Sequence, residues 1–356
     1  MPDKKNVRGR GASSNNDARY LTTTREICDD GWGVDDDGPP ALKTTVTVER
    51  AKTIISHNNS PDLPFDQTIN PYRGCEHGCI YCYARPAHAY LDLSPGLDFE
   101  SRLFSKPNAA QLLSKELARK NYRCSVISLG ANTDAYQPIE RKLCIRRSII
   151  GVLAAHHHPV TIVSKSSLVE RDIDLLAPMA ALGLVQVFVS VTSLDRVLSR
   201  RMEPRAAAPE RRLQTISNLA QAGIPTGVMF APVIPALNDH HLEDVVEAAA
   251  NHGARYAGFI MLRLPREVNG LFKEWLALHY PLRADHVLSR IRDIRQGREN
   301  DTQFGRRFKG TGPIAELVGQ RFRRACARHE LNQSPHTFET DLFCPPTKES
   351  DQLQLF

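Results

Sequence analysis

The sequence predicts an α/β protein whose parallel strands form a curved partial barrel of six βα units. Six short apolar runs alternate with amphipathic helical patterns between residues 66 and 268. Several helical patterns end in glycine before the next strand, as in "AALG" and "AQAG". The strands are almost continuously apolar, which is typical of a sheet covered on both faces. Six units are fewer than the eight of a closed barrel but enough for a partial one.

Each element follows from its own local pattern. We expect strands over residues 67–73, 124–130, 160–165, 185–192, 225–233 and 256–264. We expect the intervening helices over residues 108–120, 139–156, 172–183, 210–223 and 242–253. Proteins built from parallel βα units bind ligands at the carboxyl ends of the strands, so functional side chains should follow the strands.

The segments outside the barrel have different compositions. Residues 1–60 are polar and rich in turn residues, with an acidic patch "DDGWGVDDDGPP" at 29–40, which predicts a partly disordered arm. We expect the barrel core over residues 61–267 and a basic, helical carboxyl-terminal extension over 268–340. Residues 341–356 are expected to form a tail.

The charge is unevenly distributed along the chain. The formal net charge is +6, and the segment from Arg283 to Arg328 holds twelve basic residues against five acidic ones. Three phenylalanines interleave with them, a composition expected of a phosphate-contacting surface, although a solvated helix face shares it. No segment approaches the roughly 20 apolar residues of a membrane helix. We therefore predict a cytoplasmic protein with no membrane partner.

Three of the eight cysteines lie in the short stretch "CEHGCIYC", as Cys75, Cys79 and Cys82. In a reducing compartment such a group indicates metal binding or catalysis before a disulfide framework. Three thiolates can hold three irons of a [4Fe-4S] cluster and leave the fourth iron open to a ligand. The alternative is a zinc site completed by His77 or His88. The spacing favours iron-sulfur, because zinc sites usually pair two short knuckles and no second one follows.

The same stretch resembles a known signature. "CEHGCIYC", with an aromatic residue before the last cysteine, is similar to the CxxxCxΦC motif of the radical S-adenosylmethionine (SAM) superfamily. The segments "GANTDAYQPIE", "EPRAAAPERRL" and "APVIPALND" extend the similarity over about residues 50 to 330. This wider stretch resembles the uncharacterised branch of the superfamily related to spore photoproduct lyase. The resemblance implies a partial (β/α)6 barrel of the radical SAM type.

The resemblance also implies roles for individual residues. Cys75, Cys79 and Cys82 would hold the cluster, and Tyr81 would lie beside the adenine of SAM. The remaining assignments are Asn132, Thr133 and Asp134 for the SAM amino group, Lys165 for its carboxylate, Ser190 for its ribose hydroxyls and Arg205 for the carboxylate or ribose.

The implied activity is reductive cleavage of SAM to a 5′-deoxyadenosyl radical, which abstracts a hydrogen from a substrate. A flavodoxin or ferredoxin-like donor would supply the low-potential electron. A nucleic-acid base or lesion is the first substrate expectation. Photoproduct lyases, however, carry a cysteine hydrogen donor beside the segment that matches "SLGANTD", which has none, so no catalytic residue is assigned.

Two further expectations follow from the residues. Arg263 and Arg266, which leave the sixth strand, would face the barrel mouth and bind an anionic substrate, or would instead pair with Glu267 or Glu274. The alternative function is a non-catalytic nucleic-acid-binding protein whose three-cysteine loop holds structural zinc.

Overall fold

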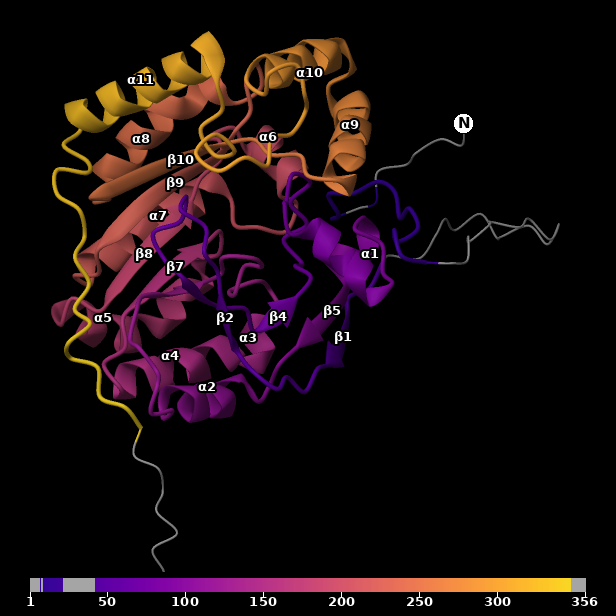
Figure 1. Cartoon of the computed structure of the whole chain (residues 1–356). Coiled ribbons are helices and arrows are strands. Elements are labelled where there is room, and N and C mark those ends of the chain that lie inside the picture. The colour runs from indigo at the N-terminus through magenta and orange to yellow at the C-terminus, as the bar shows by residue number, and fades with distance from the viewer. Residues whose placement is uncertain (1–6, 8, 22–41, 347–356) are drawn as a thin grey trace, which may run out of the picture.

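The computed structural model describes residues 7, 9–21 and 42–346. Its central feature is a seven-stranded sheet in the order β10-β9-β8-β7-β6-β3-β2 (Figure 1). The strands are β2 (Ile55–His57), β3 (Gln67–Ile69), β6 (Ile127–Leu129), β7 (Val160–Ser164), β8 (Val185–Ser190), β9 (Thr226–Val233) and β10 (Tyr256–Met261). All neighbours pair in parallel except β2, which is antiparallel to β3. The six parallel strands lie within the six expected ranges, so the predicted partial barrel is confirmed.

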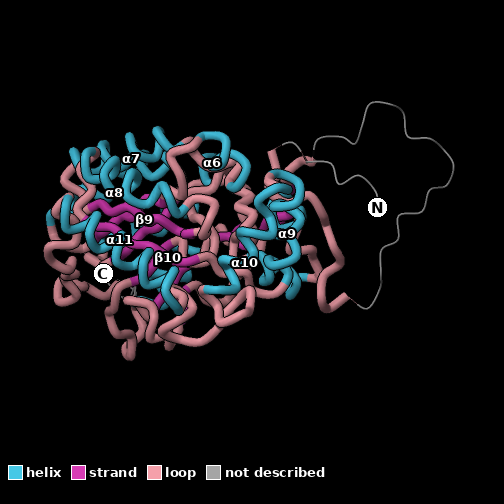
Figure 2. Tube along the Cα trace, turned by 90° about the horizontal axis from the view of Figure 1, so that it is seen from above, coloured by secondary structure: helices cyan, strands magenta, loops and turns pink. Residues whose placement is uncertain are grey.

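Helices connect the parallel strands and cover the sheet. They are α2 (Ala109–Leu117), α3 (Glu140–Leu143), α4 (Ile145–Ala155), η2 (Ser167–Asp172), α5 (Ile173–Ala181), α6 (Arg196–Met202), α7 (Pro209–Gln221), η3 (Asp239–His241) and α8 (Leu242–Asn251). Seen from above, α7 and α8 run alongside β9 (Figure 2). Consecutive side chains of β8, such as Val185, Gln186 and Val187, are buried, so both faces of the strand are covered. This two-sided cover explains why the strands are apolar throughout.

Two expected elements are interrupted. The range 67–73 divides into β3 and β4 (Tyr72–Arg73), because Pro71 has no N–H to continue a ladder. The range 139–156 divides at Cys144, whose φ is +52°. The carboxylate of Glu140 accepts a hydrogen bond from the N–H of Arg146 (3.1 Å) and so satisfies a donor in the first turn of α4.

A small second sheet lies beside the first and has the order β1-β5-β4. Its other strands are β1 (Thr45–Val48) and β5 (Arg102–Ser105), and η1 (Arg85–Leu91) and α1 (Leu97–Ser101) precede β5. β4 pairs with β5 in antiparallel fashion, with Arg73 opposite Phe104. This pairing fixes the chain two residues before the first cysteine of the "CEHGCIYC" stretch.

The carboxyl-terminal extension is helical, as expected. It contains α9 (Glu267–His279), η4 (Pro281–Arg283), α10 (Ala284–Asp293) and α11 (Gly312–Arg328). Phe322 of α11 packs on Phe259 of β10, with ring centroids 4.8 Å apart. Among the described residues, no helix has both the length and the apolar character needed to cross a bilayer.

Part of the predicted amino-terminal arm is packed against the barrel. Arg10, Ala12 and Ala18 are each at most 5% exposed. The acidic patch at 29–40 and most of the tail at 347–356 lie outside the described residues. The division of the chain into four regions stays a prediction.

Candidate active site at the cysteine loop

Cys75, Cys79 and Cys82 lie on the loop that leaves the carboxyl ends of β3 and β4. Gly78, between the first two cysteines, has a φ of +66°, which favours glycine. A Cβ atom at this position would lie 2.6 Å from the carboxylate of Glu100. The loop can therefore approach this carboxylate closely only because Gly78 lacks a side chain.

A buried ion pair supports the cysteine loop. Arg85 and Glu100 are both fully buried, and Arg85 Nη2 contacts Glu100 Oε1. The same guanidinium donates to the carbonyls of Cys79 (2.9 Å) and Gly78 (3.1 Å). Because a buried pair is favourable only when its hydrogen bonds are satisfied, these contacts fix the loop backbone as well as the two charges.

An amino-terminal segment, Arg10–Tyr20, lies against the loop, and we call it the strap. The N–H groups of Gly11 and Ala12 each donate to the Glu100 carboxylate at 2.9 Å. A Cβ on Gly11 would lie 1.9 Å from the carbonyl oxygen of Gly78. Further along, the strap bonds to α1 and α9 through the pairs Ser14–Leu97, Asn15–Asp98 and Arg19–Glu267. This contact could not be predicted from the sequence, because a polar segment without periodicity gives no packing signal.

The three cysteine side chains lie in two adjoining buried groups, and Cys82 packs against both. Cys75 is packed with Ala84 and Phe99, and Cys82 contacts this group. Burial, followed by the neighbouring charges, raises the pKa of the Cys75 thiol well above its usual value, and Cys79 and Cys82 contribute to that shift. Burial likewise raises the pKa of Cys79 to about 12. Burial and mutual repulsion disfavour the ionised form of these thiols, and binding to a cation would favour it.

A charged group adjoins Cys79. The Tyr81 hydroxyl donates to Glu203, whose other oxygen accepts from Arg212 Nη2. Lys165 Nζ lies 5.9 Å from the centre of the Tyr81 ring. Burial lowers the pKa of Lys165, but the charges of Cys79 and Glu203 more than offset this, so its pKa is raised. The structure therefore brings two predicted SAM contacts, Tyr81 and Lys165, beside a predicted cluster ligand.

Asp134 connects the ends of two strands. Its carboxylate accepts from Ser164 Oγ (2.9 Å) and from the N–H of Lys165 (2.7 Å), and His77 Nδ1 lies 3.3 Å away. Burial alone would raise the pKa of this carboxyl, but His77 and the backbone donors hold it well below its usual value. Asp134 thus positions the backbone that carries Lys165.

The other predicted SAM residues have different surroundings. Asn132 is exposed on the loop after β6, while Thr133 is buried and donates to a backbone carbonyl of β4 (3.1 Å). Ser190 is buried at the end of β8. Arg205 pairs with Glu76 at 3.2 Å. Asn132 and Thr133 follow β6, Ser190 ends β8, and Arg205 lies beside the cysteine loop. The roles of these four residues stay predictions.

Glu203 and Arg212 were not identified from the sequence. Both lie in the stretch "EPRAAAPERRL", from which only Arg205 was assigned. Both are at most 2% exposed. An acid and a base nine positions apart carry no sequence signal that they form a buried pair. Their only signal was that they lie in a stretch that resembles the radical SAM family.

The two histidines considered as zinc ligands contact protein oxygens. His88 Nε2 lies 2.9 Å from the carbonyl of Arg102, and burial lowers the pKa of His88 to about 4. His77 Nδ1 faces Asp134. In the described part of the chain, no three His, Cys, Asp or Glu side chains are arranged around a single metal ion.

Arg263 and Arg266 follow β10, and their side chains have different surroundings. Arg263 lies beside the rings of Tyr83 (5.7 Å) and Phe308 (5.1 Å). Arg266 is exposed, with Nη1 3.4 Å from the Tyr90 hydroxyl. Glu267, an expected partner, instead binds Arg19.

Many charges of the basic segment from Arg283 to Arg328 are neutralised within the molecule. Arg295 is buried and donates to the carbonyls of Met261 and Leu262. Five further arginines form ion pairs: Arg290–Asp293, Arg292–Glu299, Arg306–Asp301, Arg307–Asp62 and Arg321–Glu243. The net charge of this segment therefore overstates the positive surface that it presents.

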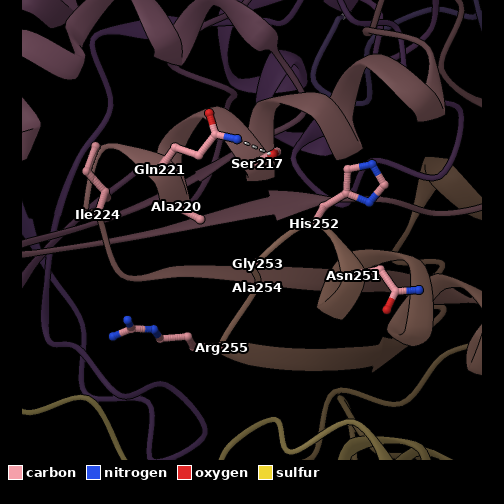
Figure 3. Close-up of a pocket in the computed structure, with 10 residues that line it drawn as sticks. Ser217, Ala220, Gln221, Ile224, Asn251, His252, Gly253, Ala254 and Arg255 are labelled. Carbon is pink, nitrogen blue, oxygen red and sulfur yellow. Dashed lines mark hydrogen bonds between the residues drawn. The ribbon is translucent and has the colours of Figure 1, made fainter.

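A hollow of about 560 Å³ lies at the opposite edge of the sheet, before β9 and β10. Ser217 and Gln221 line it and are bonded to each other (3.3 Å), and His252 and Arg255 line other sides (Figure 3). None of the residues assigned from the sequence lies here. The hollow is thus separate from the cysteine loop.

Sequence comparisons place this chain among known relatives. Residues 69–249, about half of the chain, match the model of the radical SAM superfamily. An uncharacterised protein of Mycobacterium bovis is 40% identical over 238 residues, which are 66% of this chain and 69% of that protein. An uncharacterised protein of Methanocaldococcus jannaschii is 29% identical over 241 residues, covering 67% and 85% of the two chains.

Solved structures of spore photoproduct lyase share the fold. The lyase complexed with dinucleoside spore photoproduct superposes with a TM-score of 0.56 at 16% identity, over 84% of each chain. A double mutant with bound AdoMet and the same dinucleoside gives a TM-score of 0.55 at 15% identity, over 80% of this chain and 79% of that one. At this identity the likeness concerns the fold. The family match and the cysteine motif within it show that this chain belongs to the radical SAM superfamily of enzymes.

Proposed function

We propose that this enzyme binds a [4Fe-4S] cluster through Cys75, Cys79 and Cys82 and uses it to cleave SAM reductively. The observation that carries this proposal is the grouping of three thiols, two buried and one partly buried, on one loop at the carboxyl end of a parallel sheet. Soft thiolates on one short loop are the ligand set that iron-sulfur clusters use. Lys165, beside Cys79, supplies a cation where the carboxylate of SAM would bind.

The other residues at this edge would bind and orient SAM. Tyr81 offers a ring beside Cys79, held in place by its bond to Glu203. We assign the remaining contacts as the sequence predicted: Asn132, Thr133 and Asp134 at the amino group, Ser190 at the ribose and Arg205 at the carboxylate or ribose. Thr133 and Asp134 already bond to protein groups, so they would act mainly by fixing the backbone around SAM.

A cluster held by Cys75, Cys79 and Cys82 would supply one electron for the cleavage of SAM to methionine and a 5′-deoxyadenosyl radical, which would abstract a substrate hydrogen. The chain's own contribution is to fix the reacting atoms and to exclude water. The electron requires a low-potential donor such as a flavodoxin or a ferredoxin-like protein.

A nucleic-acid base or lesion is the substrate class that we favour. The solved lyase whose fold this chain shares was complexed with a dinucleoside photoproduct. The "SLGANTD" segment holds no cysteine, so a lyase that relies on a cysteine hydrogen donor at this position is a poor model for the reaction.

The test is anaerobic purification, reconstitution with iron and sulfide, and assay of 5′-deoxyadenosine after addition of dithionite and SAM. We expect about four irons per chain, the content of one cubane cluster, and 5′-deoxyadenosine formation. Changing Cys75, Cys79 or Cys82 to Ser should abolish product formation. Cys124→Ser is the matched control, because Cys124 precedes β6 and lies outside the loop. Stoichiometric zinc would contradict the proposal and favour the structural zinc alternative. A cluster that never cleaves SAM would contradict the catalytic part of the proposal.

A further inference from the structure

A group of aromatic and basic side chains lies directly after the last cysteine, and we call it the seam cluster. It consists of Tyr83, Arg263, Phe304, Arg307 and Phe308. The Arg263 guanidinium lies 5.7 Å from the Tyr83 ring centre and 5.1 Å from that of Phe308. Arg307 lies 4.7 Å from the Phe304 ring centre and 4.6 Å from that of Phe308. Cations and rings therefore alternate through the group.

The seam cluster lies between the loop that follows β6 and the end of β10. The Tyr83 hydroxyl donates to the carbonyl of Ala131, just after β6. Arg263 follows β10, the strand at one edge of the sheet. Phe308 is attached to the end of β10, because its carbonyl accepts from the N–H of Met261 (2.8 Å). The group thus lies at the carboxyl-end opening of the sheet, beside the cysteine loop.

The two arginines of the seam cluster have different charge balances. Arg307 pairs with Asp62 at 2.6 Å and also bonds to Ser60. Arg263 forms no ion pair with any described residue, and its buried Nε atom has no hydrogen-bond partner there. Burial and the charge of Arg307 lower the pKa of Arg263. An arginine stays charged at neutral pH, and a partly buried charge with an unused donor is stabilised by an anion.

The rings offer a second kind of contact. Tyr83 is 48% exposed and Phe304 is 54% exposed, although both pack against arginines on one side. Exposed aromatic faces next to a guanidinium provide stacking surfaces for planar rings, and each base stacked on such a ring contributes about 1–3 kcal/mol. A ligand with an anionic group and a planar ring would satisfy both features.

We propose that the seam cluster binds one nucleotide unit of the substrate, with its phosphate on Arg263 and its base stacked on Tyr83 or Phe304. The proposal rests on the proposed function, because it assigns this position to the substrate of a reaction that begins at the adjacent cysteine loop. The nucleotide could be free or part of a strand, since both present the same phosphate and ring. The competing role for Arg263 is to balance the charge of SAM or of the metal cluster.

The test is the binding of a fluorescein-labelled 12-residue thymidine oligonucleotide to the reconstituted full chain, followed by fluorescence anisotropy. We expect Arg263→Gln to weaken binding about tenfold and to reduce the salt dependence by about one released counterion. Arg263→Lys should retain more affinity than Arg263→Gln, since it keeps the charge. The matched control is Arg323→Gln, which changes an exposed arginine on α11 and should change affinity less than twofold.

Unlabelled thymidine 5′-monophosphate and the unlabelled oligonucleotide are the competitors. Displacement by the mononucleotide would indicate a free nucleotide as ligand, and displacement only by oligonucleotide would indicate a strand.

Absence of oligonucleotide binding by the wild-type chain would overturn the inference, and so would equal losses of affinity in Arg263→Gln and Arg323→Gln. A third contrary result would be a loss of SAM cleavage in Arg263→Gln, measured without oligonucleotide, that is as large as its loss of oligonucleotide affinity. The last result would assign Arg263 to SAM. Failure of the proposed function would instead appear as missing iron or missing 5′-deoxyadenosine in the wild-type chain, whether or not the oligonucleotide binds.

Discussion

The two ends of the parallel strands differ in the groups that they present to a ligand. We call the two sides of the sheet at which the strands begin and end the amino-end edge and the carboxyl-end edge. The amino-end edge has the hollow of about 560 Å³, lined by helix ends and by Ser217, Gln221 and His252. The carboxyl-end edge has the cysteine loop, where Cys79, Lys165 and other ionisable groups shift one another's pKa values. None of the residues assigned from the sequence lines this hollow. The buried thiols and the charged groups with shifted pKa values lie together at the carboxyl ends of the strands. Parallel βα proteins bind their ligands at this end.

A substitution at Glu100 should have the largest effect at the carboxyl-end edge. Glu100→Gln would leave Arg85 buried without its counter-charge and would weaken the bonds from Gly11 and Ala12. We expect the free energy of unfolding to fall by about 3–5 kcal/mol, measured by urea denaturation. Glu243→Gln is the control, because it breaks the partly exposed pair with Arg321 and should cost at most about 1 kcal/mol. Equal effects of the two variants would show that the loop does not depend on the buried pair.

Lys165 tests the charge beside Cys79. Lys165→Met should weaken SAM binding about tenfold to a hundredfold, the range for a lost hydrogen bond to a charged group. The iron content should stay unchanged, because the three thiol ligands remain. Equilibrium dialysis of SAM with iron analysis of the same samples measures both quantities. Loss of iron together with SAM affinity would instead assign Lys165 to the stability of the loop.

Gly11 tests the strap. Gly11→Ala places a Cβ 1.9 Å from the carbonyl oxygen of Gly78, so the strap must move away from the cysteine loop. We expect a loss of about 1–3 kcal/mol in unfolding free energy, as for other overpacked sites, and faster removal of iron by a chelator. Gly9→Ala serves as the control, because a Cβ at Gly9 meets no atom within 4 Å. Its positive φ of +73° sets the background strain for an alanine.

Arg255 tests the amino-end edge, where the smallest effect is expected. Arg255→Gln changes a residue that lines the hollow and lies at the opposite end of the strands from the cysteines. We expect the rate of 5′-deoxyadenosine formation and the affinity for SAM to stay within twofold of the wild-type chain. A larger loss in either quantity would reverse the assignment of the two edges.

The sequence indicated the barrel and the cysteine loop because both depend on local patterns. The six strands appear as apolar runs, and Cys75, Cys79 and Cys82 appear as a spacing. The pairs Arg85–Glu100 and Glu203–Arg212 could not be predicted, since only tertiary packing buries them together. The strap was predicted to be part of a partly disordered arm, because its order comes from backbone bonds to Glu100 rather than from apolar periodicity.

The most direct test of the central claim is the electron paramagnetic resonance spectrum of the dithionite-reduced, reconstituted protein, recorded with and without SAM. Three cysteine ligands leave one iron open, so we predict the signal of a reduced [4Fe-4S] cluster whose g values shift when SAM is added. The Cys124→Ser control should give the same shift. A cluster signal that SAM leaves unchanged, or a protein that holds zinc and gives no signal, would contradict the account.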